Sequence, residues 1–261
     1  MQVAGIQFDI AWEDPAESFR RVDPLVRRAV EGGARFVTLP EMFATGFSMD
    51  AARVAAHGDE IRARLTGLAS DLGVWILAGF AEADGRDFFN ACCLMTPDGT
   101  PVLHYRKIHP FTLAGEHEHY AAGTTVETAE VEGVRVTPLI CYDLRFGELF
   151  RTTAHRTDLF VVLANWPERR SVAWRVLLRA RAIDCQAWVL GVNRMGTDGN
   201  GFSHRGDSSL VDPMGEVLST LAWEEGVISG DVDVESVRNL RKKLPFLADR
   251  RPEIYRSLEQ D

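Results

Sequence analysis

The sequence VRVTPLICYDLRFGELF, residues 134–150, joins an apolar strand, a single cysteine and the start of a helix. Residues 134–140 have the apolar character of a buried strand, and residues 146–155 have a helical pattern. Cys141 therefore lies between a strand end and a helix start. Unpaired backbone N–H groups and the helix dipole at that position would lower the pKa of the thiol and favour a nucleophilic thiolate.

Strands and helices alternate on both sides of this stretch, with turn residues between them. The pattern predicts strands at residues 2–10, 34–39, 74–80, 159–164, 188–193 and 226–234. It predicts helices after Asp14 and at residues 60–72 and 172–186, and strand hairpins at residues 88–107 and 126–140. This alternation is typical of an α/β fold, and it fits either two sheets covered by helices or one doubly wound sheet.

The chain has the length and composition of one globular domain. Its 261 residues are 46% hydrophobic and 26% charged, which is enough apolar material for a core that excludes water. We therefore expect one domain over residues 1–261, with residues 244–261 as a C-terminal extension. The apolar residues of this extension, Phe246, Ile254, Tyr255 and Leu258, predict that it packs on its own domain or on a second subunit.

The net charge of -9 argues against nucleic acid as a partner, because phosphate groups repel a negative surface. No run of about 18 apolar residues occurs, so no membrane-spanning helix is expected. The first ten residues lack a basic segment followed by a long apolar one, which argues against a signal peptide. The four cysteines lack CxxC spacing, and we expect free thiols in the cytoplasm.

Three polar residues directly follow predicted strands: Glu41, Lys107 and Cys141. Strand ends are where α/β proteins gather functional groups. Taken singly, each residue has a simpler interpretation: a cysteine is often a small buried apolar residue, and a glutamate or lysine is often exposed at an element end. Together they indicate a thiol nucleophile with a base and a cation.

The blocks that contain these residues resemble the three catalytic blocks of the nitrilase, or carbon-nitrogen hydrolase, superfamily. They are LPEMFATGF (39–47), YRKIHPF (105–111) and LICYDLRFGELFR (139–151). Further similar blocks are ANWPERR (164–170), WRVLLRARAIDCQAWVLGVNR (174–194) and GDSSLVDPMGE (206–216), so the resemblance covers nearly the whole chain. It implies a four-layer αββα sandwich and a homodimer in which two such sandwiches stack.

The resemblance also implies roles for the three residues. Glu41 would be the general base, Lys107 would stabilise the oxyanion, and Cys141 would be the nucleophile. These roles agree with physical chemistry, because a carboxylate can take the thiol proton and pass it to the leaving ammonia. An ammonium group and a backbone N–H can hold the charge of the tetrahedral intermediate. No cofactor is implied.

A second glutamate stands between the lysine and the cysteine in many relatives. The segment AGEHEHYAAG (114–123) offers Glu116 and Glu118. The resemblance selects Glu116, because it stands seven residues before Gly123, as the family glutamate does before a turn glycine. Glu116 would orient Lys107 and the substrate, and Glu118 would be a solvated loop residue.

The substrate is indicated by the residues around the nucleophile. Tyr142-Asp143 follows Cys141, which is an amidase-like pattern, whereas nitrilases proper tend to have Trp-Glu there. The full set of blocks is most similar to bacterial omega-amidases, which implies 2-oxoglutaramate and 2-oxosuccinamate as substrates. Their distal carboxylate calls for a guanidinium partner. The candidate substrate-binding residues are Phe43, Tyr142, Arg145, Trp166, Arg169 and Arg170.

Other functions stay open at this point. The chain could be another amidase or a carbamoylase of the same superfamily, or a small-molecule binding protein without turnover. His104, His109, His117 and His119 suggest a metal-dependent hydrolase, but HEH on a loop does not match the helical HExxH spacing, and we expect no metal. Cys185 and the pair His204-Arg205 depart from the usual family patterns and have no assigned role.

Overall fold

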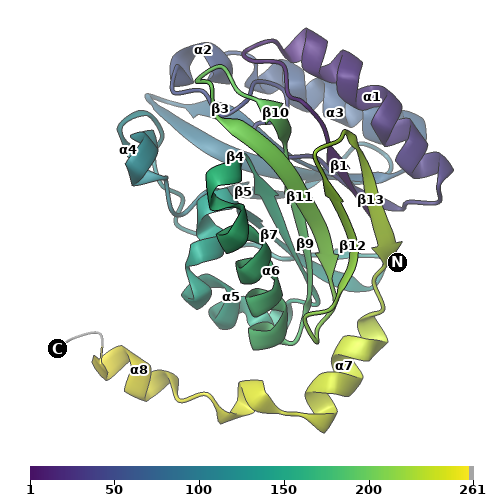
Figure 1. The fold of residues 1–261 in the computed structure, drawn as a ribbon, viewed down its shortest axis with the longest axis vertical. Helices are drawn as coiled ribbons and strands as arrows, with labels where there is room; N and C mark the ends of the chain where they lie inside the picture. The colour runs from purple at the N-terminus through teal and green to yellow at the C-terminus, as the bar shows by residue number, and fades with distance from the viewer. Residues whose placement is uncertain (259–261) are drawn as a thin grey trace.

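Two β-sheets lie face to face in the structure, a computed structural model that describes residues 1–258 (Figure 1). The first sheet has the strand order β13-β1-β2-β3-β4-β5. Its strands are β1 (Gln2–Gln7), β2 (Phe36–Thr38), β3 (Trp75–Asp84), β4 (Asp87–Met95), β5 (Pro101–Arg106) and β13 (Gly226–Asp231). The pairs β1–β2 and β2–β3 are parallel, and the others are antiparallel.

The second sheet has the order β10-β11-β9-β8-β7-β6, and β12 pairs with β11. Its strands are β6 (Ala129–Val131), β7 (Val134–Ile140), β8 (Leu159–Ala164), β9 (Trp188–Asn193), β10 (Met195–Thr197), β11 (Ser203–Val211) and β12 (Val217–Ala222). The pairs β7–β8 and β8–β9 are parallel. Both sheets are therefore mixed, with the parallel strands at their centres.

Helices cover the outer face of each sheet (Figure 1). The helices against the first sheet are α1 (Pro15–Glu31), α2 (Ala51–Ala55) and α3 (Gly58–Leu72), and those against the second are α5 (Gly147–Thr153) and α6 (Ser171–Cys185). The short α4 (Glu116–His119) lies in a loop, and α7 (Val234–Lys243) and α8 (Pro252–Leu258) follow β13. The expected four-layer αββα sandwich is confirmed.

Local sequence signals explain where α1 begins. The Asp14 side chain accepts a hydrogen bond from the backbone N–H of Glu17 at 3.0 Å, and Pro15 occupies the first turn. The Glu17 carboxylate pairs with the guanidinium groups of Arg20 and Arg21, one turn further along the helix. One face of the helix is buried against the sheet, so tertiary packing sustains it.

The core between the sheets keeps water from the strand ends. Every residue of β8 and of β9 is buried, because the opposite sheet covers one face and helices cover the other. Buried side chains from both sheets form one cluster that includes Phe36, Leu139 and Leu163, and other side chains of the first sheet form a second cluster with α1 and α3. Polar groups placed at the ends of these strands therefore lie in a medium of low polarity, where their mutual interactions are strong.

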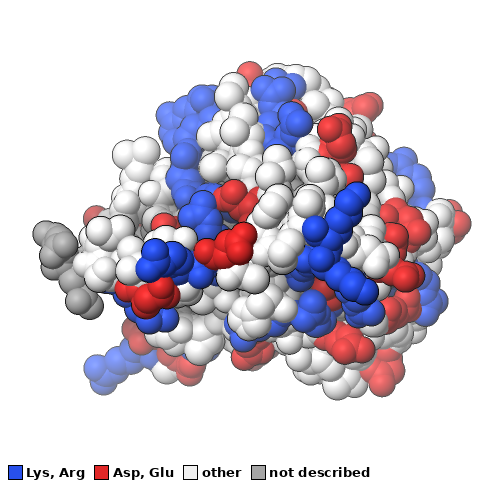
Figure 2. Space-filling view, turned by 90° about the horizontal axis from the view of Figure 1, so that it is seen from below, with Lys and Arg blue, Asp and Glu red and all other residues white. Residues whose placement is uncertain are grey.

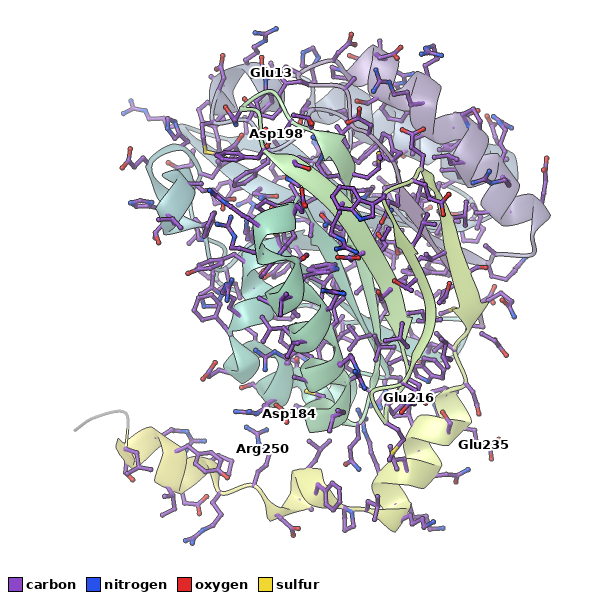
Figure 3. The ribbon with its side chains drawn as sticks, in the orientation of Figure 1. Glu13, Asp184, Asp198, Glu216, Glu235 and Arg250 are labelled. Atoms are coloured by element: carbon purple, nitrogen blue, oxygen red, sulfur yellow. The ribbon has the colours of Figure 1, made fainter. Side chains whose placement is uncertain are left out.

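The C-terminal segment runs along the end of the sandwich, from α7 to α8 (Figure 1). Arg250 donates a hydrogen bond to the carbonyl of Arg151 on α5, so the segment returns to the body there (Figure 3). Figure 2 shows basic and acidic side chains interspersed over the face on which this segment lies. Among the described residues, no helix combines the length and apolar character that crossing a membrane requires.

Candidate active site

Three strand ends bring the expected catalytic side chains to one cavity. Glu41 follows β2, Lys107 follows β5, and Cys141 directly follows β7. Glu41 and Lys107 are fully buried, and Lys107 and Cys141 line a cavity of about 420 Å³. Asp198 also lines this cavity, and its label in Figure 3 shows the end of the sandwich at which the cavity lies.

Lys107 lies between two buried carboxylates. Its Nζ is 2.9 Å from Glu41 Oε1 and 2.8 Å from Glu116 Oε2. The Asn90 amide on β4 donates to Glu41 Oε1 at 2.7 Å and to Glu116 Oε1 at 2.8 Å. The backbone N–H of Asn165 donates to Glu41 Oε2 at 2.8 Å. Glu41 therefore has both oxygens held, and its position is fixed before any substrate arrives.

The electrostatics of this cluster follow from one ammonium group facing two carboxylates. Burial alone would lower the pKa of Lys107, but Glu116 and Glu41 outweigh it and raise that pKa, so the ammonium stays charged. Burial raises the pKa of Glu116, Lys107 opposes this, and the nearby Glu41 carboxylate raises it further. The cluster thus carries a net negative charge, and it can hold one additional proton.

Cys141 occupies a strained turn. Its φ of 45° lies in the left-handed region, which costs a residue other than glycine about 1–3 kcal/mol. A short 3-10 helix, Cys141–Arg145, begins at this residue. Strain of this kind persists only where the surroundings fix it, and it commonly presents a side chain to a functional site.

The surroundings of Cys141 favour the protonated form of its thiol. Burial raises its pKa well above the ordinary value, and the Glu41 carboxylate adds to this, while Lys107 opposes it. The direction is opposite to the lowered pKa predicted for this position, because burial is the largest influence on the thiol. Attack by the sulfur therefore requires a base that removes the thiol proton, and Glu41 is the adjacent carboxylate.

The cavity wall contains five of the six residues predicted to bind substrate: Tyr142, Arg145, Trp166, Arg169 and Arg170. The sixth prediction, Phe43, is corrected by the structure. Its side chain is fully buried in the core, where its ring packs edge-on against Phe19 with the centroids 5.1 Å apart. Phe47, four residues later, lines the cavity instead.

Three guanidinium groups of this wall stack on aromatic rings. Their central carbons lie 5.0 Å from the Trp166 ring for Arg145, 4.7 Å from the Phe202 ring for Arg169, and 4.9 Å from the Phe111 ring for Arg170. In the part of the chain that is described, none of the three forms an ion pair with a carboxylate. They are positioned cations with free donors, which suits them to an anionic ligand.

Several residues of the site carried no signal in the sequence. Asn90 and Asn165 donate hydrogen bonds to the buried carboxylates, and Phe111 and Phe202 lie under two of the guanidinium groups. An amide on a strand and a phenylalanine near a turn are common features, so composition and spacing do not single them out. The only available signal was their place inside or beside the resembling blocks.

The histidine loop lies apart from the catalytic cluster. His117 and His119 line a second, shallower cavity with Asp50 and Asp87. Glu116, which directly precedes His117 in the sequence, points instead into the cluster and accepts a hydrogen bond from Lys107. Within residues 1–258, no group of three or more His, Cys, Asp or Glu side chains has an arrangement that could hold a metal ion.

His204 lines the cavity that contains Cys141, and its burial makes the free energy of unfolding depend on pH. Burial and the nearby Arg194 lower its pKa from 6.5 to about 4. The unfolded chain therefore binds a proton more tightly, so the stability due to neutral His204 is complete above pH 6.5 and is lost as the pH falls to about 4. This loss amounts to about 3 kcal/mol of unfolding free energy.

Urea unfolding of the wild type and of His204→Gln at pH 7 and pH 4.5 checks this prediction. The difference in unfolding free energy between the two proteins should narrow toward acid pH, because the variant has no buried imidazole to protonate. His155→Gln, which changes an exposed histidine, is the control and should follow the wild type. Parallel pH profiles for the wild type and His204→Gln would contradict the assignment.

Comparison with known proteins agrees with this geometry. The profile of the carbon-nitrogen hydrolase family matches residues 2–242. The chain is 37% identical to the omega-amidase YafV of Escherichia coli K12, over 95% of this chain and 96% of that protein. It is 32% identical to the 2-oxoglutaramate amidase of Bacillus subtilis, over 97% of this chain and 98% of that protein.

A solved structure is similar in its fold as well as its sequence. XC1258 from Xanthomonas campestris, described as a CN-hydrolase superfamily protein with an arsenic adduct in its active site, superposes with a TM-score of 0.90. The two chains are 32% identical, and the match covers 96% of this chain and 97% of that one. On its sequence, its fold and the cluster at its strand ends, the chain belongs to the carbon-nitrogen hydrolase family.

Proposed function

We propose that this protein is a thiol omega-amidase that releases ammonia from the terminal amide of 2-oxo dicarboxylic acid monoamides, 2-oxoglutaramate and 2-oxosuccinamate. One observation carries the proposal. The cavity that holds Cys141 beside the Glu41–Lys107–Glu116 cluster also holds three guanidinium groups that pair with no carboxylate of residues 1–258. A substrate with an amide at one end and a carboxylate at the other matches both halves of this cavity. The similarity to proteins named omega-amidase and 2-oxoglutaramate amidase supports the same substrates.

The reaction begins with proton transfer from the Cys141 thiol to Glu41. The sulfur then bonds to the amide carbon, and the carbonyl oxygen takes the negative charge. The Lys107 ammonium and the backbone N–H of Tyr142 stabilise this oxyanion. Glu41 next gives its proton to the amide nitrogen, the carbon-nitrogen bond breaks, and ammonia leaves. The acyl group stays on Cys141 as a thioester.

Water completes the cycle. Glu41 takes a proton from a water molecule, and the oxygen of that water attacks the thioester carbon. Lys107 again stabilises the oxyanion. The carbon-sulfur bond breaks, the sulfur regains the proton from Glu41, and the dicarboxylic acid leaves. Glu116 acts on Lys107, whose charge and position it maintains. No cofactor is required by these steps.

A substrate panel tests the proposal. Purified protein is assayed for ammonia release from 2-oxoglutaramate, 2-oxosuccinamate, glutamine, a carbamoyl amino acid and an aliphatic nitrile. Turnover of the two oxo-amides far above the others is expected. Preference for the carbamoyl compound would favour the alternative, a carbamoylase of the same family. Binding of the oxo-amides without turnover would favour a non-catalytic binding protein.

Arg170 is the arginine expected to bind the distal carboxylate. It is the most shielded of the three, since Arg145 and Arg169 are exposed and Arg170 is half-buried. Hydrogen bonds between charged groups in such sites contribute about 1.5–3 kcal/mol, so Arg170→Gln should raise KM for 2-oxoglutaramate by about 10–100-fold. Turnover of a neutral amide such as pentanamide should not change. An unchanged KM for 2-oxoglutaramate would assign the carboxylate to another residue.

We also propose a cytoplasmic homodimer. The exposed face of α6 carries an apolar stripe of Val172, Val176 and Ile183, and the C-terminal segment exposes Phe246 and other apolar residues. A second subunit that covers these surfaces would remove them from water. The four cysteines are free thiols, which agrees with a reducing compartment. The proposed domain of residues 1–261 includes the extension 244–261, whose residues 259–261 lie outside the described chain.

Light scattering after size-exclusion chromatography tests the dimer. Val176→Asp places a charge in the middle of the α6 stripe, and it should convert a dimeric protein into a monomer because an unpaired charge opposes burial. Ser70→Asp, which introduces the same single negative charge on the exposed side of α3, the helix that packs on the other sheet, serves as the control. A monomeric wild type at micromolar concentration, or a dimeric Val176→Asp, would contradict this assignment.

A further inference from the structure

Asp143 is a fully buried carboxylate that the reaction described above does not use. Four donors surround its two oxygens. Oδ1 accepts from the backbone N–H of His109 at 3.1 Å and lies 2.9 Å from His109 Nδ1. Oδ2 accepts from the Tyr105 hydroxyl at 2.7 Å and from the backbone N–H of Ile140 at 3.0 Å. A buried carboxylate with every lone pair engaged is rigidly held.

These donors belong to two separate catalytic segments. Tyr105 and His109 stand two residues before and after Lys107, and Ile140 directly precedes Cys141. The Tyr105 hydroxyl, while donating to Asp143, also accepts from the backbone N–H of Ile108 at 3.2 Å. The backbone on one side of Lys107 is thus linked through a single side chain to the backbone of the nucleophile turn.

The strained turn itself depends on the same residue. Cys141, with its φ of 45°, lies between two residues that bind Asp143. Before it, the backbone N–H of Ile140 donates to the Asp143 carboxylate. After it, the backbone N–H of Phe146 donates to the Asp143 backbone carbonyl at 3.0 Å. The Phe146 ring stacks on His109 with the ring centroids 3.7 Å apart and the planes 9° from parallel. Both ends of the turn are therefore fastened to the loop that follows Lys107.

We propose that Asp143 is a positioning residue that keeps the Cys141 thiol and the Lys107 ammonium at the separation that thioester formation requires. The inference rests on the proposed function for the reaction it serves, and it adds a residue that touches neither the substrate nor the reacting atoms. Displacement of a reacting group by about 1 Å can cost an enzyme about 100-fold in rate, so a residue that fixes this separation has a large effect on turnover.

Asp143→Asn tests the proposal with a change of nearly equal volume. Each oxygen of Asp143 accepts one backbone N–H, so an amide, which has a single oxygen, leaves one of these N–H groups facing its NH2 group. The turn or the loop must then shift. We expect kcat to fall by about 100-fold while KM changes by less than about threefold, since the substrate contacts are retained.

A second readout makes this test independent of the substrate. Alkylation of Cys141 by iodoacetamide, located by peptide mass spectrometry, depends on proton removal by Glu41 and so reports the geometry of the thiol. It should be slower in folded Asp143→Asn than in the wild type. Slower alkylation together with an inactive wild type would retain the positioning role and reject the proposed function. A kcat and an alkylation rate equal to those of the wild type would overturn the positioning role.

Asp158→Asn is the matched control. Asp158 is also fully buried, and it accepts from the backbone N–H of Arg135 at 3.1 Å and from its guanidinium at 2.7 Å. It lies at the opposite end of β7 from Cys141. This variant should lower the melting temperature but leave kcat per folded molecule unchanged. A loss of kcat equal to that of Asp143→Asn would assign both effects to general destabilisation.

Tyr105→Phe decides the question if Asp143→Asn fails to fold. It removes one hydroxyl, and with it the link between Asp143 and Ile108, while the ring remains in the core. An intermediate effect is expected, with kcat reduced by about 10-fold and KM retained. A Tyr105→Phe protein with the kcat and alkylation rate of the wild type would overturn the proposal.

Discussion

Replacing Cys141 with alanine is expected to lower kcat for 2-oxoglutaramate by at least about 10⁴-fold, because it removes the sulfur that forms the covalent intermediate of the proposed reaction. The protein should remain folded, since the change removes one sulfur atom from a cavity wall. Ammonia release by enzyme purified free of host amidases measures the effect. Cys141→Ser should be almost as inactive, because the Glu41 carboxylate is too weak a base to remove the proton of a serine hydroxyl group.

Cys185→Ala is the matched control for this variant. Cys185 is another buried thiol, but it lies on α6 and is not among the described residues that line the cavity of Cys141. Its replacement should leave ammonia release and its inhibition by iodoacetamide unchanged. Retention of more than about one hundredth of the wild-type kcat by Cys141→Ala would contradict the covalent mechanism, whatever the substrate.

Replacing Lys107 with methionine should produce the largest combined loss of stability and activity. The variant leaves Glu41 and Glu116 buried together without a cation, and breaking a buried ion pair in this way costs about 3–5 kcal/mol of unfolding free energy. Loss of the oxyanion partner should lower kcat by about 10²–10³-fold in the fraction that folds. Urea unfolding and ammonia release measure the two effects.

The pH dependence of the stability loss identifies its cause. With Lys107 gone, one of the two carboxylates gains a proton more readily, so acid relieves the repulsion between them. The difference in unfolding free energy between wild type and Lys107→Met should therefore shrink from pH 8 to pH 5. Lys242→Met, a change on the exposed side of α7, should alter stability by less than about 0.5 kcal/mol at either pH. A difference that does not vary with pH would contradict the charge-based explanation.

Much of the fold follows from local patterns in the sequence. Strands β8 and β9 have the predicted bounds, because uninterrupted apolar runs between turn residues leave little choice of register. The first strand was predicted to reach residue 10, but β1 ends at Gln7, and Asp9 forms only an isolated bridge with Met195. The end of β1 therefore depends on contacts with residues such as Met195, which is distant in the sequence, and a local sequence pattern cannot predict such contacts.

The pairing of the strands into two sheets could not be predicted from periodicity alone. Strands buried on both faces look alike whether the cover is a helix or a second sheet, as β8 and β9 do. The family resemblance distinguished the two arrangements, and the structure confirms the sandwich.

The meeting of Glu41, Lys107 and Cys141 at one cavity was predictable because each combines an unusual residue type with a strand end. The error at Phe43 arises from backbone conformation. Met42 has a φ of 43°, in the left-handed region, and this turn directs Phe43 into the core and brings Phe47 to the cavity. The raised pKa of Cys141 was missed for a related reason, since the degree of burial at a strand end is a property of the tertiary structure.

The most direct test of the central claim is to look for the acyl-enzyme itself. Wild-type protein is mixed with 2-oxoglutaramate, quenched in acid during the first turnovers, digested at low pH and analysed by peptide mass spectrometry. The proposal predicts a 2-oxoglutaryl group in thioester linkage on the peptide that contains Cys141, at a level that falls as substrate is consumed. Ammonia release without any acylation of Cys141, or with acylation at a different residue, would contradict it.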